Sequence, residues 1–123
     1  MAAPNLIGAT TINGKTTGAN LTTTSATTVL NNASGSGKCL KVNTVNACNY
    51  TASLATITLG YYNAANVGGT QFQIVGNVVV PANSTLNVID KSSQYYLEEN
   101  SSFGATAGTA NAIIITCSYE DIS

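Results

Sequence analysis

The side chains that could carry out catalysis are few in this chain. Its 123 residues include no histidine, the commonest general base and the commonest transition-metal ligand in proteins. Glu98 and Glu99 are the only adjacent acids in mid-chain. On a strand their side chains would point to opposite faces, so they cannot flank one bond as a paired acid and base must. The residues therefore predict that this protein is not an enzyme.

The same two acids are the best candidates for metal ligands. A calcium site would combine Glu98, Glu99 and Asn100 with nearby carbonyl oxygens. A solvated turn is the preferred interpretation, and we expect no metal and no other cofactor. The run Gly35-Ser36-Gly37-Lys38 lacks the spacing of a phosphate-binding loop. Four lysines without an arginine make a poor nucleic-acid surface, so we expect no nucleic-acid partner.

Three cysteines, Cys39, Cys48 and Cys117, are an odd number. The first residues, MAAPNLIGATTING, have neither the basic region nor the apolar run of an export signal, which predicts a protein made in the cytoplasm and not secreted. Buried free thiols are therefore the favoured interpretation. A Cys39–Cys48 disulfide would need a turn between them, and the segment is typical of one continuous strand. No apolar run is long enough to span a membrane.

Charge is unusually low. Charged residues make up 7% of the chain, against roughly 25% in typical domains, and the net charge is -1. Thr, Ser and Asn must make the surface hydrophilic instead. Because near-neutral proteins repel one another weakly, this composition favours a protein that is part of an assembly, with a monomeric extracellular domain as the alternative.

Apolar residues recur with a period of two, which is typical of strands with one buried face. The clearest run extends from Phe72 to Val80, and Pro81 should end it because proline lacks a backbone donor. In the strand from Cys39 to Cys48 the apolar phase shifts, which predicts a bulge near Asn43-Thr44. About eight such strands and no convincing helix predict an all-β fold, a single antiparallel β-sandwich or jelly roll.

The first twenty residues differ from the rest. They set short apolar pairs among glycines, so residues 1–20 are predicted to form an extended arm or edge strand and residues 21–123 the sandwich. Apolar residues in segments too short to form a core of their own predict interfaces: Leu6, Ile7 and Ile12 in the arm, and Tyr119 and Ile122 at the C-terminal end. Such an arm could add a strand to the sheet edge of a neighbour.

The last third of the chain adds a resemblance. VPANSTLNVIDKSSQYYLEENSSFGATA and AIIITCSYEDIS resemble small virion proteins of tailed bacteriophages, particularly those infecting aquatic bacteria, with their proline turn, Tyr-Leu-Glu-Glu turn and Ser-Tyr-Glu ending. One departure is plain: the Glu-Glu-Gly-Asp turn of that family is Glu98-Glu99-Asn100-Ser101 here. Asn can take the left-handed conformation that Gly supplies, so the turn is retained.

The resemblance implies a structural virion protein, foremost a capsid decoration (cement) protein. Such a protein would bind the major capsid protein or other virion proteins, as a homo-oligomer in the virion. A neck, tail or fibre protein is one alternative. A glycan-binding module that uses Tyr50, Tyr61 or Tyr62 beside the Asn63–Thr70 loop is another.

Overall fold

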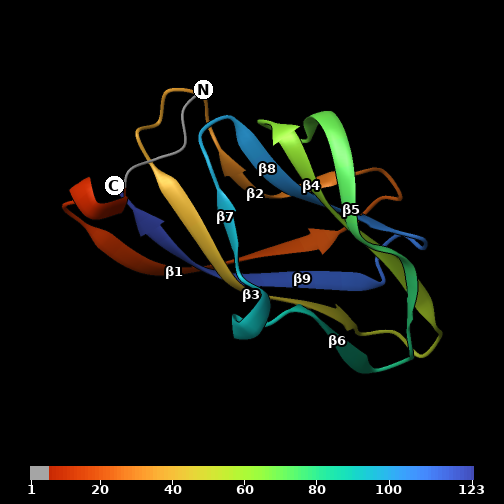
Figure 1. Cartoon of the computed structure of the whole chain (residues 1–123). Helices are drawn as coiled ribbons and strands as arrows, with labels where there is room; N and C mark the ends of the chain where they lie inside the picture. The colour runs from red at the N-terminus through yellow and green to blue at the C-terminus, as the bar shows by residue number, and fades with distance from the viewer. Residues whose placement is uncertain (1–5) are drawn as a thin grey trace.

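The computed structural model describes residues 6–123 and shows two antiparallel sheets packed face to face (Figure 1). Over these residues the strands are β1 (Ile12–Leu21), β2 (Thr27–Asn32), β3 (Cys39–Asn49), β4 (Ala55–Ala64), β5 (Gly68–Val80), β6 (Ser84–Ile89), β7 (Tyr95–Leu97), β8 (Ser101–Ala107) and β9 (Ile113–Ile122). Two short 3₁₀ turns, η1 (Leu6–Gly8) and η2 (Lys91–Ser93), complete the elements. The prediction of an all-β antiparallel sandwich is confirmed.

The strand order places the first and last strands side by side. One sheet, called the first sheet, has the order β1-β9-β3-β6, and β7 also pairs with β3. The second sheet has the order β2-β8-β4-β5. Every pair of neighbouring strands is antiparallel. Strands β1 and β2 meet along one side of the sandwich, and β5 and β6 meet along the opposite side.

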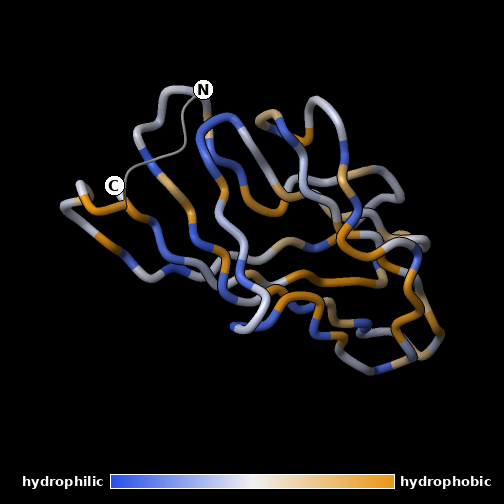
Figure 2. Tube along the Cα trace, in the orientation of Figure 1, coloured by the Kyte–Doolittle hydropathy of each residue, from blue (hydrophilic) through white to orange (hydrophobic). Residues whose placement is uncertain are grey.

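The core lies between the sheets and takes one face of each strand. Figure 2 shows a hydrophobic run along β9 in the interior of the first sheet. The burial of β3 alternates from Val45 to Asn49, as the period of two requires. The largest side chains that are fully enclosed come from both sheets: Phe103, Leu21, Ile57, Leu59, Ile89, Leu97, Ile113 and Ile115. The contact between the two apolar faces therefore holds the layers together.

Two local predictions are confirmed by the pairing. The register between β3 and β9 shifts between Val42 and Thr44, where the bulge was expected. Strand β5 ends at Val80, directly before Pro81. The predicted loop at Asn63–Thr70 is shorter than expected, because β4 continues to Ala64 and β5 already begins at Gly68.

The hairpin turn between β4 and β5 packs onto the outer face of the second sheet. The Val67 backbone N–H donates to the hydroxyl of Ser102 over 2.9 Å. A Cβ atom added to Gly104 would collide with the side chains of Val67 and Tyr62. Gly104 therefore leaves the space that this turn occupies. Within the described residues, no helix has the length and apolar character needed to cross a membrane.

Candidate functional site: the open edge of the first sheet

Strand β1 is the most regular edge of the sandwich. It pairs with β9 from Ile12↔Ile122 to Leu21↔Ile113 without a register shift. Among residues 6–123, no strand pairs with its other side. An open strand edge is a template for hydrogen bonding to another chain.

The backbone groups that face outward from β1 follow from the pairing. The Thr11 N–H donates to the Ser123 carbonyl over 2.9 Å, and the Ser123 N–H donates to the Thr11 carbonyl over 3.0 Å. Hydrogen-bonded and non-bonded pairs alternate in an antiparallel ladder, so every second residue from Thr11 bonds to β9. The residues between them direct their N–H and C=O groups away from the sheet: Ile12, Gly14, Thr16, Gly18 and Asn20.

Charge does not protect this edge. Lys15 is the only charged residue of β1. Its Nζ atom lies 3.1 Å from Oδ2 of Asp121, and Nζ of Lys38 lies 3.2 Å from the same oxygen. Burial raises the pKa of the Asp121 carboxyl, but hydrogen bonds from Lys15 and Lys38 outweigh burial and leave the pKa below its ordinary value. The lysine is therefore bound to its own domain, although edge lysines usually deter pairing with another chain.

Strand β5 is a less regular edge on the opposite side. It contains no charged residue, but its register with β4 shifts at three places. Asn77 has φ 49° at one of these irregularities, and its N–H donates to the Thr58 hydroxyl over 2.9 Å. Bulges twist an edge away from regular pairing, so β5 offers a shorter continuous template than β1.

The predicted interface residues lie around the beginning of β1. Ile12 is 63% exposed and opposes Ile122, which is buried. Leu6 and Ile7 are in η1, 39% and 97% exposed. Tyr119 is half-buried and packs against the core from the opposite face of β9. The structure thus brings Ile12 and Ile122 together, while Tyr119 faces the interior.

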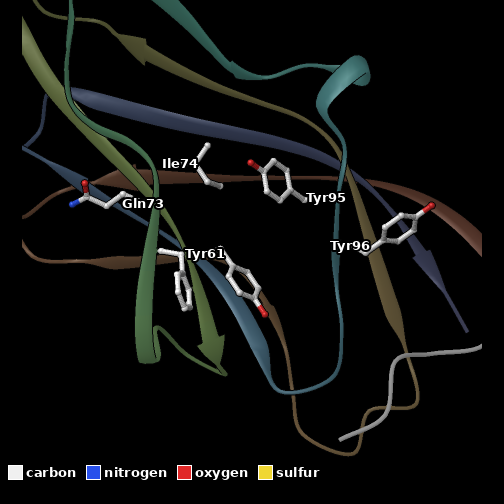
Figure 3. A pocket seen from close by; sticks show the side chains of 6 residues that line it. Tyr61, Gln73, Ile74, Tyr95 and Tyr96 are labelled. Atoms are coloured by element: carbon white, nitrogen blue, oxygen red, sulfur yellow. The ribbon is translucent and has the colours of Figure 1, made fainter.

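An aromatic pocket opens where β5 approaches β7 (Figure 3). Its volume is about 320 Å³, and it is lined by Tyr61, Phe72, Gln73, Ile74, Tyr95 and Tyr96. In Figure 3 the Tyr95 side chain points toward Ile74, and Tyr96 points the other way. The ring centroids of Tyr95 and the buried Phe103 are 5.7 Å apart. The lining combines three tyrosines with Phe72, Gln73 and Ile74 and includes no carboxylate, lysine or cysteine.

The glycan-binding alternative named Tyr50, Tyr61 or Tyr62, and these tyrosines lie in different parts of the sandwich. Tyr61 and Tyr62 are successive residues of β4, so their side chains lie on opposite faces of the sheet. Tyr62 is also buried, at 7% exposure. Tyr50 follows the end of β3 in the other sheet. These three tyrosines therefore do not share one surface.

The three cysteines are free thiols in different surroundings. Cys39 and Cys117 are buried, as predicted, whereas Cys48 is half-buried on β3. Burial raises the pKa of the Cys117 thiol to about 12. Burial and the negative charge of Glu98 raise the pKa of Cys39. Among residues 6–123 no three acids, cysteines or histidines group together as a metal site.

The fold is that of a two-sheet antiparallel β-sandwich, and its full length matches a solved structure. That structure is described as "Bacillus endospore appendages form a novel family of disulfide-linked pili". The match has a TM-score of 0.52 at 14% sequence identity and covers 100% of this chain and 96% of the other. No family model and no curated protein matches the chain. At this identity the comparison shows a common fold.

The comparison overturns the phage hypothesis. The chain matched over its full length belongs to endospore appendages and is not a phage protein, so the resemblance to phage virion proteins is wrong. The capsid decoration role is wrong with it, as are the neck, tail, fibre and glycan-binding alternatives. The predicted location in a virion, in a protein made in the host cytoplasm and not secreted, is corrected by the same finding. The motifs quoted for the resemblance are turns and strand ends, which unrelated β-proteins share.

Proposed function

We propose that this chain is a non-enzymatic structural subunit that associates with copies of itself to form a filament. The observation that carries the proposal is the open edge of β1, ten residues long and paired without a register shift on its inner side. The full-length similarity to a chain from pili supports it. The low charge of the chain, 7% of residues, suits contacts whose centre excludes water.

The arrangement of the edges favours a filament over a closed dimer. Two β1 edges that paired with each other would form a two-fold interface and stop there. Strands β1 and β2 lie on one side of the sandwich, and β5 and β6 lie on the other. Pairing of β1 with an edge on the opposite side of the next copy is a head-to-tail contact, which extends into a filament when the rotation between copies does not close a ring. We therefore assign head-to-tail pairing through β1.

The residues before β1 extend the proposed contact. In this proposal residues 1–20, of which 1–5 lie outside the described residues, form the arm and edge strand of the assembly, and residues 21–123 form the rest of the sandwich. Leu6, Ile7 and Ile12 supply apolar contacts along the arm. Ile122 lies opposite Ile12 beside this contact, and Tyr119 acts indirectly by packing β9 against the core.

The test removes one backbone N–H from the open edge of β1 and leaves the hydrogen bonds between β1 and β9 intact. Thr16 directs its N–H away from β9, so Thr16→Pro deletes a donor from the open edge. We expect Thr16→Pro to remain folded by circular dichroism and to lose assembly in electron microscopy. Thr16→Val keeps the N–H and should assemble like the wild type.

A neighbouring variant serves as a control for folding. The Thr17 N–H faces β9, so Thr17→Pro should lower the melting temperature by breaking the ladder. Unchanged assembly of a folded Thr16→Pro protein would refute pairing through β1. A wild-type protein that stays monomeric at all concentrations would refute the proposed function itself.

A further inference from the structure

The number of accessible thiols limits how copies of this chain can be joined. In a head-to-tail filament each subunit takes part in two junctions. A disulfide at every junction would use one thiol from each partner, and therefore two thiols from every subunit. The matched structure belongs to disulfide-linked pili, so the question applies directly to the three cysteines of this chain.

Only one of these cysteines is accessible. Cys48 is half-buried, while Cys39 and Cys117 are 2% and 0% exposed. Cys117 opposes Val45 in the middle of the first sheet and belongs to the apolar core. Reaching its sulfur from a neighbouring copy would require the two sheets to separate.

Reactivity follows the same order as exposure. The thiolate is the form that attacks a disulfide, and a raised pKa keeps a cysteine in the unreactive thiol form. The pKa of Cys117 is raised to about 12 and that of Cys39 is raised as well. Both buried cysteines are thus protected by enclosure and by protonation.

Disulfides within one chain would not supply a second accessible thiol. Cys39 and Cys48 lie nine residues apart on β3, about 30 Å at the usual rise per residue. Cys48 opposes Ile114, whereas Cys117 opposes Val45, so these two cysteines lie at different levels of the sheet. A disulfide needs Cα atoms within about 7 Å.

Resting on the proposed function, we infer that copies of this chain are joined without disulfides, through the backbone hydrogen bonds of strand edges. One accessible thiol can join two chains at most, and a Cys48–Cys48 bond would end a covalent series at the dimer. The linkage of this chain thereby differs from that described for the pili it resembles in fold. Its assemblies should withstand reductant.

The first test counts accessible thiols in the native protein. The 123-residue chain is treated with a maleimide, with and without denaturant, and adducts are counted by intact mass spectrometry. We expect no more than one adduct in the native protein, absent from Cys48→Ser, and three adducts after denaturation. Two or three adducts in the native protein would overturn the inference.

The second test examines the assemblies themselves. They are grown under air and then imaged with and without dithiothreitol, and the same samples are run on denaturing gels without reductant. We expect filaments in both conditions, in the wild type and in Cys48→Ser, and only monomer on the gel. A dimer band that Cys48→Ser removes would show a disulfide between copies and would overturn the inference.

The outcomes separate the two proposals. Covalent ladders of three or more chains, or filaments that dissolve in dithiothreitol, would overturn the inference and leave the proposed function intact. Absence of any assembly would refute the proposed function, and the inference would fall with it.

Discussion

Replacing Phe103 by alanine should be among the most destabilising single changes in this domain. Its ring is fully enclosed and contacts Tyr61 of its own sheet, with centroids 6.4 Å apart, and Tyr95 of the other sheet at 5.7 Å. Truncation of a buried Phe to Ala costs about 3–5 kcal/mol. The two ring contacts place Phe103→Ala toward the upper part of that range, because favourable aromatic pairs add about 0.5–1.5 kcal/mol each.

Phe72 provides the matched control. It is also an aromatic residue of the second sheet, but it is 54% exposed, and its ring lies 6.1 Å from the Tyr61 ring between centroids. Phe72→Ala should cost about 1 kcal/mol or less, since little apolar area returns to water. The free energy of unfolding is measured by urea denaturation followed by far-ultraviolet circular dichroism.

The comparison of the two variants tests the packing directly. A Phe103→Ala cost below about 1.5 kcal/mol, or one equal to that of Phe72→Ala, would refute the placement of this ring between the sheets. If Phe103→Ala does not fold, Phe103→Leu replaces it, with an expected cost of about 1–2 kcal/mol because the side chain retains most of its apolar volume.

Three further predictions follow from the packing, the ion pairs and the arm. Gly104→Ala should cost about 1–3 kcal/mol in urea denaturation because its Cβ meets occupied space, whereas Gly14→Ala, with nothing within 4 Å, should change stability little. The ion pairs of Asp121 should stabilise the fold above pH 3.8, because the folded-state pKa of this carboxyl is lowered, and this stabilisation should be lost as the pH falls below 3.8. Asp121→Asn should flatten the dependence of the free energy of unfolding on pH in that acid range, and an unchanged pH dependence would contradict the role of these pairs. Leu6→Ser combined with Ile7→Ser should reduce pelleting of assemblies at a fixed concentration while leaving the melting temperature unchanged, and unaltered pelleting would exclude these side chains from the contact.

Local features of the fold could be predicted from the sequence. The alternation from Phe72 to Val80, the stop at Pro81 and the bulge near Asn43-Thr44 depend on neighbouring residues, and all three are observed. The strand that begins at Gly68 was not predicted, because glycines at a hairpin are compatible with both loop and strand.

Pairing between distant segments was beyond sequence reasoning. Ile12 and Ile122 lie at opposite ends of the chain, and nothing in their local sequence identifies them as cross-strand partners. The surroundings of the buried Tyr62 likewise include Gly104, which comes from the distant strand β8. The open edge of β1 becomes visible only when the strand order of the whole sheet is known.

The most direct test of the central claim is negative-stain electron microscopy of the purified 123-residue chain over a range of concentrations, beside its Thr16→Pro variant. We predict filaments that grow with the concentration of the wild type and are absent from the folded variant. Isolated particles of monomer size at every concentration of the wild type would contradict the account.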